Sequence, residues 1–191
     1  FNNGSFEEGG RFYGGWWQRV DESHRSRIRL NNKATVEIDY SALHVILAYA
    51  KVNVDYWKLT DKDPYRVPID GVENPEHIRD INKLFFLLSL NASNETSLYK
   101  AFRSELNYKE YPYTFPDKVL AQLLEDIKLL HPKIAHLICS GAGLKLMNLD
   151  SQMVEFIIKD FVKTNTPILT VHDSFVVPFG QEDKLHKLMK K

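Results

Sequence analysis

Two aspartates far apart in the sequence have the surroundings expected of a divalent-metal site. Asp39 ends an apolar run and is followed by a helical pattern, whereas Asp173 lies between two short apolar runs. These apolar runs predict strands, which would fix each carboxylate rigidly at the end of a sheet. Magnesium prefers oxygen ligands, and two such aspartates can converge on a pair of ions. Transfer of a nucleotide onto a 3′-hydroxyl requires this arrangement.

The composition bounds the class of protein without identifying it. The chain has 191 residues, of which 43% are hydrophobic and 26% charged, enough for one core and a small lobe. Its formal net charge is +0, so a nucleic-acid-binding role would need locally concentrated positive charge. Cys139 is the one cysteine, which excludes a disulfide framework and favours a reducing compartment.

Membrane and export signals are not recognisable in the sequence. No apolar run approaches the roughly 18 residues of a membrane span, and no signal peptide is visible. We therefore expect a protein that is not secreted, has no membrane partner and is either cytoplasmic, in a bacterial or viral context, or associated with nucleic acid. Because the chain begins at Phe1 and not at Met, we also expect a fragment of a longer protein.

The order of elements predicts strands at both ends of the chain and helices between them. A period-two pattern over 25–30 and an apolar run over 34–39 predict a hairpin, and 168–177 predicts a second. Between them, helices are predicted over about 41–52, 74–90, 94–106, 117–130, 132–139 and 150–164, and a basic helix ends the chain. An α+β fold, with a helical lobe inserted into an antiparallel sheet, would produce this order.

The two aspartates lie in motifs that resemble those of known polymerases. Asp39-Tyr40-Ser41 resembles motif A of family A DNA polymerases, the DNA polymerase I group. His172-Asp173-Ser174-Phe175 resembles motif C of the single-subunit RNA polymerases of bacteriophages and mitochondria. The DNA enzymes carry His-Asp-Glu there, so Ser174 replaces their third carboxylate. A transposon- and virus-encoded lineage between the two groups is similar to this mixture.

Three further matches occur in the order that both groups show. Gly10-Arg11-Phe12-Tyr13 resembles their Gly-Arg motif, and Lys62-Asp63-Pro64-Tyr65 resembles the element after motif A. Arg79 and Lys83 have the spacing of the Arg-x-x-x-Lys motif of the fingers helix. The resemblance covers about residues 10–180. It implies a right-hand palm (about 1–56 and 140–191) with an inserted fingers lobe (about 57–139), without a recognisable thumb.

The resemblance also implies roles for individual residues. Asp39 and Asp173, with the Tyr40 backbone, would hold two magnesium ions, for which manganese can substitute. Arg79 and Lys83 would bind a nucleoside triphosphate. Its phosphates would also meet the Tyr40 and Ser41 amides if a helix begins there. A DNA or RNA primer–template would contact Arg11, His172 and Ser151. Separately from the resemblance, alternation places Arg25, Arg27 and Arg29 on one strand face, which is either a ridge that follows phosphates or a solvated face.

Two positions depart from both groups and concern the choice of sugar. Asn91-Ala92 stands where they carry Tyr-Gly, and His44 stands where the DNA enzymes carry a Glu that excludes ribonucleotides. A bulky His44 favours deoxyribonucleotides, whereas Asn91 could hydrogen-bond a 2′-hydroxyl. We favour DNA over RNA synthesis because a steric gate works by bulk alone.

Two alternatives to a polymerase fit the same residues. A metal-dependent phosphodiesterase or nuclease could use both aspartates, although such enzymes usually cluster more carboxylates. A degenerate polymerase that only binds nucleic acid would explain Asn91-Ala92. For Trp16 and Trp17, packing is the commoner role and base stacking the alternative.

Overall fold

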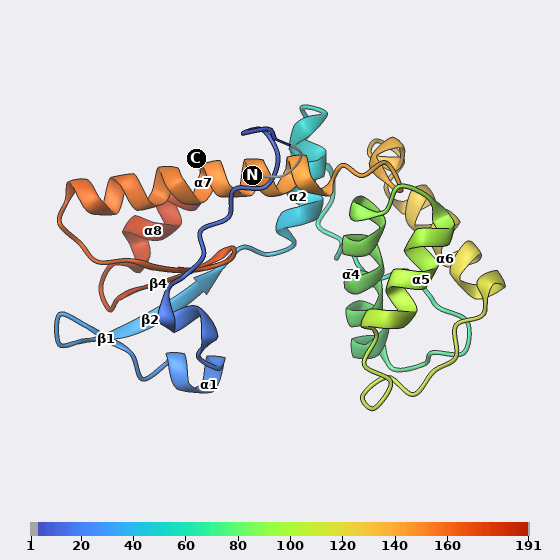
Figure 1. Ribbon diagram of the computed structural model, residues 1–191, viewed down its shortest axis with the longest axis horizontal. Helices are drawn as coiled ribbons and strands as arrows, with labels where there is room; N and C mark the ends of the chain where they lie inside the picture. The colour runs from blue at the N-terminus through green and yellow to red at the C-terminus, as the bar shows by residue number, and fades with distance from the viewer. Residues whose placement is uncertain (1–3, 191) are drawn as a thin grey trace. The chain divides into compact units, whose positions relative to one another are not determined.

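The computed structural model describes residues 4–190 and confirms the α+β class. The chain divides into two compact units (Figure 1): unit 1, Phe1–Leu43 with Met147–Lys191, and unit 2, His44–Leu146. The lobe predicted as 57–139 lies within unit 2, which also includes 44–56 and 140–146. Asp39 and Asp173 both belong to unit 1.

Unit 1 contains a four-stranded antiparallel sheet of order β1-β2-β4-β3. Its strands are β1 (Arg29–Leu30), β2 (Lys33–Asp39), β3 (Leu169–Val171) and β4 (Ser174–Pro178). Asn31 and Asn32, with φ of 52° and 61°, form the two-residue β1–β2 loop, as the right-handed twist of a hairpin requires. The second hairpin is confirmed, with His172 and Asp173 as its two-residue loop.

One face of this sheet is buried by two helices, α7 (Gly143–Lys163) and α8 (Glu182–Met189), which lie on the same side in Figure 1. Side chains alternate along a strand, so Val36 and Ile38 of β2 point to this face together with Phe175 and Val177 of β4. They pack with Val154, Ile157, Phe161, Leu185 and Leu188 into one core. This packing fixes the register of β2 against β4.

Short helical segments precede β1 in unit 1: η1 (Trp16–Arg19) and α1 (Glu22–Arg25). The predicted strand over 25–30 is therefore wrong except at its last two residues. Arg25 ends a helix, Arg27 follows in a turn and Arg29 begins β1, so they do not share one strand face. The backbone amides of residues 25–28 bond to carbonyls three or four positions earlier, so this segment forms helical turns instead of a strand.

Unit 2 is helical. Its helices are α2 (Leu43–Lys51), α3 (Tyr56–Leu59), α4 (Pro75–Asn91), α5 (Glu95–Glu105), α6 (Asp117–Leu130) and η2 (Ala135–Leu137). The predicted starts of α4 and α5 are confirmed by their caps. Asn74 accepts from the Glu76 and His77 amides, and Asn94 forms a capping box with Ser97.

Three predicted boundaries in and beside this unit are wrong. The helix expected over 132–139 is only the single turn η2, and α7 begins at Gly143 instead of near 150. Ser41 does not cap α2, which begins at Leu43 after a left-handed Ala42 (φ 55°). Between residues 4 and 190, no helix is long and apolar enough to cross a membrane.

We expect Phe175→Ala to lower the free energy of unfolding by about 3–5 kcal/mol, because truncating a buried ring leaves a cavity in the core. Phe175 is 0% exposed, whereas Phe179, just beyond β4, is 68% exposed. Phe179→Ala is the matched control and should change the free energy by less than about 0.5 kcal/mol. Urea unfolding followed by circular dichroism measures both, and equal effects would contradict the assigned core.

Candidate functional site

The pairing of β2 with β4 brings the two motif aspartates to the same end of the sheet. Asp39, the last residue of β2, pairs with Ser174, the first residue of β4. Asp173 directly precedes Ser174 and belongs to the β3–β4 loop. Asp39 at the end of β2 and Asp173 directly before β4 are therefore close together, although most of the chain separates them in the sequence. Alternation along β2 places Asp39 on the face opposite the α7–α8 core.

Backbone strain is concentrated beside these aspartates. Within residues 4–190, positive φ at residues other than Gly and Asn occurs at Ala42, Cys139 and His172. Ala42 lies three positions after Asp39 and His172 immediately before Asp173, with φ of 55° at each. A left-handed L-residue costs roughly 1–2 kcal/mol, so the surrounding structure must impose it. Such strain is typical of functional sites.

A polar network holds the sheet face that carries Asp39. Arg25 donates from Nε and Nη2 to the two Glu37 carboxylate oxygens at 3.0 and 2.9 Å, and Ser174 Oγ donates to Glu37 Oε1 at 2.7 Å. Burial alone would raise the pKa of Glu37, but the bonds from Arg25 and Ser174 outweigh it and lower that pKa. Arg25 is thus engaged within the sheet instead of forming the predicted phosphate-binding ridge. Arg27 and Arg29 are exposed.

Arg11 of the predicted Gly-Arg motif is paired inside unit 1. Its Nε donates to Asp150 Oδ2 at 2.7 Å, and the Arg11 and Asp150 side chains are 16% and 2% exposed. The other Asp150 oxygen, Oδ1, is buried and has no hydrogen-bond partner within the described part of the chain. Tyr40 lies near this carboxylate. Burial, with a smaller contribution from Asp150, raises the pKa of Tyr40 to about 12, so its hydroxyl stays protonated.

Ser151 does not present its side chain at the surface. It is 8% exposed, and its hydroxyl donates to the Asn148 carbonyl at 2.7 Å. Gly10 lies against it with φ of +103°, and a Cβ there would come within 3.1 Å of Ser151 Oγ. Asn148 donates to the Gly9 carbonyl at 3.1 Å. Helix α7 therefore anchors the Gly-Arg segment, and the predicted contact of Ser151 with nucleic acid is not supported.

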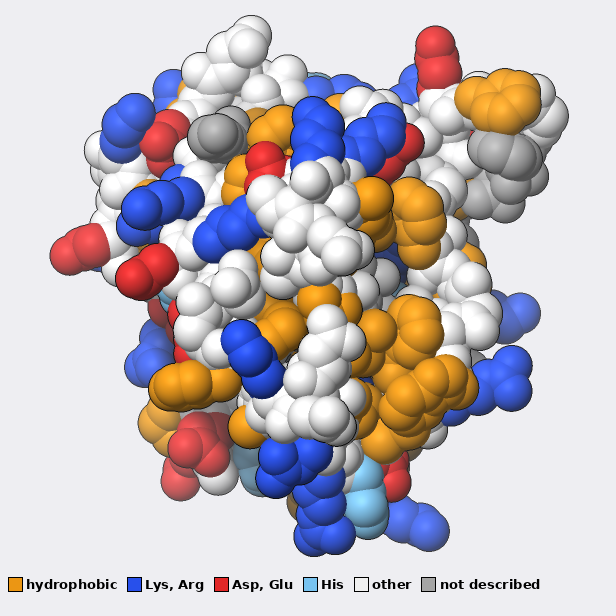
Figure 2. All heavy atoms as spheres, turned by 90° about the vertical axis from the view of Figure 1, so that its left-hand side faces the viewer, with side chains coloured by type: hydrophobic (Ala, Val, Ile, Leu, Met, Phe, Trp, Pro, Cys, Tyr) orange, Lys and Arg blue, Asp and Glu red, His pale blue; other side chains and the backbone are white. Residues whose placement is uncertain are grey.

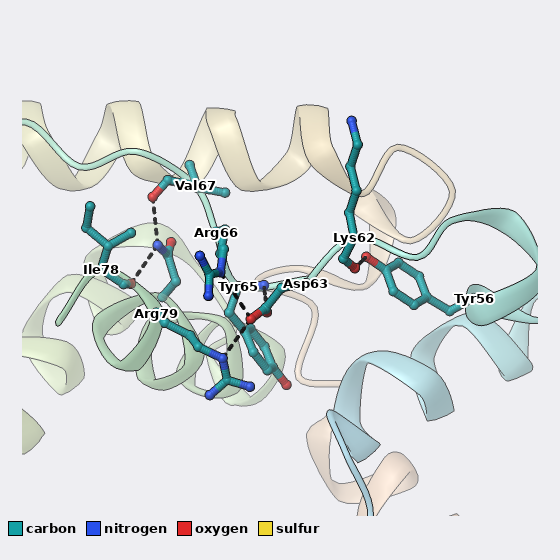
Figure 3. Close-up of polar contacts among 9 residues, drawn as sticks. Tyr56, Lys62, Asp63, Tyr65, Arg66, Val67, Ile78 and Arg79 are labelled. Carbon is teal, nitrogen blue, oxygen red and sulfur yellow. Dashed lines mark hydrogen bonds and ion pairs between the residues drawn. The ribbon is translucent and has the colours of Figure 1, made fainter. Parts of the chain in front are cut away.

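In unit 2, Arg79 of the predicted fingers motif is oriented by Asp63 (Figure 3). Arg79 Nε donates to Asp63 Oδ2 at 2.7 Å, and its guanidinium lies 5.6 Å from the centroid of the Tyr65 ring. The Tyr65 amide donates to Asp63 Oδ1 at 2.9 Å. Burial raises the pKa of Asp63, but these bonds outweigh it and lower that pKa. Figure 3 shows the terminal guanidinium nitrogens turned away from Asp63.

A buried histidine supports the same loop. His131 is 0% exposed, and its Nε2 lies 3.0 Å from the Pro64 carbonyl, which can only accept. Nδ1 lies 3.2 Å from the Tyr49 hydroxyl and accepts its hydrogen when the ring is neutral. Burial lowers the pKa of His131. The neutral ring therefore connects α2 to the residue after Asp63.

The remaining predicted nucleotide-binding residues differ in their exposure and contacts. Lys83 is exposed one turn after Arg79 on α4, and His44 is half-buried in the first turn of α2. The Asn91 amide donates to the Leu87 carbonyl at 2.8 Å. A Cβ on Gly143 would come within 2.1 Å of Asn91 Oδ1. Asn91 thus packs against the backbone where α7 begins.

The donor set at the end of the sheet fits magnesium in kind. Asp39 and Asp173 provide carboxylates, and the backbone carbonyl of Tyr40 follows in the chain. Magnesium is commonly bound by one or two carboxylates and completes its coordination with water and substrate phosphates. No group of three or more His, Cys, Asp or Glu side chains placed to hold a metal ion occurs between residues 4 and 190.

Comparisons with protein-family models, curated proteins and solved structures found no match for the chain. The resemblance to polymerases therefore rests on the short sequence motifs alone.

Sequence reasoning did not identify Glu37, Asp150 or His131 as partners of the site. Glu37 could have been found from the sequence, because a charged residue two positions before Asp39 lies on the same strand face as Asp39. The Arg11–Asp150 pair spans 139 positions and the His131–Pro64 contact 67, so neither leaves a local pattern.

We expect Asp150→Ala to lower the free energy of unfolding by about 3 kcal/mol, because it leaves the largely buried Arg11 without its partner. Glu155, also on α7, is the matched control: its side chain is 50% exposed and pairs with Lys159. Glu155→Ala should change the free energy by less than about 0.5 kcal/mol. Chemical unfolding compares the two, and a negligible effect of Asp150→Ala would refute the structural role of this pair.

We expect the melting temperature to fall as the pH drops below about 6.5, the ordinary pKa of histidine. The folded-state pKa of His131 is lowered by burial, so the unfolded state binds more protons in acid and becomes favoured. His131→Gln should melt lower at neutral pH and lose this pH dependence. His186→Gln, which changes an exposed histidine on α8, should retain it. Thermal unfolding between pH 5 and 8 measures these slopes, and an unchanged slope in His131→Gln would exclude this origin.

Proposed function

We propose that the protein is a template-directed nucleotidyltransferase that extends a 3′-hydroxyl with nucleoside triphosphates on a DNA or RNA primer–template. The observation that carries the proposal is the register of β2 against β4. This register pairs Asp39 with Ser174 and so brings the aspartates of two separate motifs to one end of the sheet. A right-hand palm with an inserted fingers lobe is the fold that this proposal implies.

In the proposed site, Asp39 and Asp173 hold the metal ions through oxygens fixed by paired strands. Bound magnesium would supply the charge neutralisation and the activated hydroxyl that this chemistry needs. Ser174, which replaces the third carboxylate of the DNA enzymes, donates its hydrogen to Glu37 and so ties the two aspartate-bearing strands together. Two carboxylates then suffice for metal binding, as the resemblance to the RNA polymerases implies.

The triphosphate is assigned to Arg79 and Lys83 of unit 2. Asp63 engages Arg79 through Nε alone, which leaves both terminal nitrogens available for a forked contact with phosphate oxygens. The Tyr65 ring under the guanidinium restricts its motion. An arginine oriented in this way before its ligand arrives loses less entropy on binding.

The contacts of Asn91 support the choice of deoxyribonucleotides in this proposal. Asn91 is the residue that could recognise a 2′-hydroxyl, but its amide is bonded to Leu87 and its oxygen lies against Gly143. These contacts give Asn91 a packing role. His44, five positions after Asp39, then remains the candidate for sugar selection by bulk.

A primer-extension assay tests the proposal. DNA and RNA templates are crossed with dNTPs and NTPs in the presence of magnesium or manganese. We expect extension with dNTPs, and a loss of at least about 100-fold in Asp39→Asn and in Asp173→Asn, because each change weakens metal binding. Asp183→Asn, on the exposed side of α8, is the charge-matched control and should leave extension unchanged.

The same reactions separate the alternatives. Shortening of a labelled primer without triphosphates, abolished by either aspartate change, would replace the proposal with a nuclease. Full extension by either variant would refute the two-metal assignment. Binding of primer–template without any turnover would instead indicate a degenerate polymerase.

A further inference from the structure

Unit 1 exposes aromatic side chains close to the candidate catalytic aspartates. Within the loop from Gly10 to Arg19, Phe12, Tyr13 and Trp16 are 44%, 70% and 64% exposed. Figure 2 shows the side that faces left in Figure 1, where hydrophobic side chains lie at the surface among charged ones. We call the side chains of Phe12, Tyr13 and Trp16 the aromatic platform.

The platform is fixed to the sheet by polar contacts. Trp17 Nε1 and Gln18 Nε2 both donate to the Thr170 carbonyl of β3, at 2.9 and 3.1 Å. Gln18 also donates to the Phe12 carbonyl at 2.8 Å and accepts from the Gly14 amide at 3.1 Å. The side chain of Gln18 thus closes the loop that carries the exposed rings.

Two glycines make this loop possible. Gly14 has φ of +105°, which turns the chain between Tyr13 and Trp16. A Cβ on Gly15 would lie 2.4 Å from the Trp17 ring, so that indole lies directly on the Gly15 backbone. Trp17 therefore has the packing role, while Trp16, at 83° to it with 6.1 Å between ring centroids, projects to the surface. Exposed rings are here held in place before any ligand binds.

The platform adjoins the loop that carries Asp173. The Tyr13 and His172 rings meet edge to face, with centroids 6.4 Å apart. His172 is exposed and directly precedes Asp173. A strand stacked on the Tyr13 ring would therefore pass beside the candidate metal site.

Charge alone gives unit 1 little attraction for phosphates. It contains twelve Lys and Arg residues and twelve Asp and Glu residues. Between Gly9 and Val20, however, the sequence has no acidic residue, and Arg19 is exposed, whereas Arg11 is paired with Asp150. Exposed aromatic rings are typical of surfaces on which the bases of a single strand stack, because every base has a face that can stack.

We propose that the aromatic platform binds single-stranded nucleic acid by stacking bases on Tyr13 and Trp16. The location beside Asp173 gains its meaning from the proposed polymerase function, but the stacking itself does not require catalysis. A duplex hides its base faces and would bind more weakly. A protein partner or a second copy of the chain is the competing occupant.

Fluorescence anisotropy with labelled 12-nucleotide oligo(dT) and oligo(U), without metal or triphosphate, tests the proposal. We expect Tyr13→Ala and Trp16→Ala each to weaken binding of the single strand roughly tenfold. Trp16→Phe, which keeps a ring, should restore most of the affinity. Phe179→Ala removes an equally exposed aromatic ring just beyond β4, outside the platform, and should bind as the unchanged protein does.

Three results would overturn the proposal: single-strand affinity unchanged in Tyr13→Ala and Trp16→Ala, equal affinity for a blunt duplex, or a dimer that Trp16→Ala dissociates. Asp39→Asn distinguishes this proposal from the polymerase proposal, because it should bind the oligonucleotide normally while failing to extend a primer. Normal extension with no effect of the platform variants on binding would refute the platform alone. Platform-dependent binding with no extension by the unchanged protein would refute the polymerase alone.

Discussion

The pairing of β2 with β4 is the contact on which the rest of unit 1 depends. These strands come from opposite ends of the chain, so their association carries a large loop-closure cost that only burial of apolar side chains can offset. The offset comes from Phe175 and Val177, which pack with residues of β2, α7 and α8. A slip of β2 by one residue would turn Val36 and Ile38 to solvent and move Asp39 towards the core. The same apolar contacts that stabilise the sheet therefore also set the position of the aspartates.

The opposite face of the sheet shows how polar residues complete this arrangement. Glu37 receives hydrogen bonds from Arg25 and from Ser174, so one carboxylate links α1, β2 and β4. A glutamate at position 174 would place a second negative charge beside Glu37 and repel it. The serine thus suits the network that surrounds it. Its departure from the DNA-polymerase motif has a structural reason within this chain, independent of the number of metal ligands.

Local signals predicted the parts of the fold that local chemistry determines. Asn74-Pro75 and Asn94 correctly predicted the starts of α4 and α5, because each of these helices is capped by residues within its own first turn. The strand predicted over 25–30 was wrong because the backbone of 25–28 forms helical turns, while Arg25 reaches Glu37 twelve positions away, and neither feature is visible in the alternation of residue types. Helix α7 begins at Gly143, where a side chain would clash with Asn91, a partner 52 positions earlier that leaves no local pattern. The aspartates could be selected from motifs, whereas Asp150 and His131 act through distant partners that the sequence does not reveal.

If the protein binds nucleic acid as proposed, a chain without net charge must do so by means other than long-range attraction, and the contacts of its arginines then matter. Arg11 and Arg25 are committed to carboxylates of unit 1, while Arg79 is oriented by Asp63 but keeps two nitrogens available. Pairing with an acid cancels the charge of an arginine at long range yet fixes its geometry at short range. Such a protein would recognise nucleic acid through short-range contacts and not through long-range electrostatic attraction. Its association with nucleic acid should then depend on salt less steeply than that of a basic polymerase, because fewer counterions are released from the phosphates.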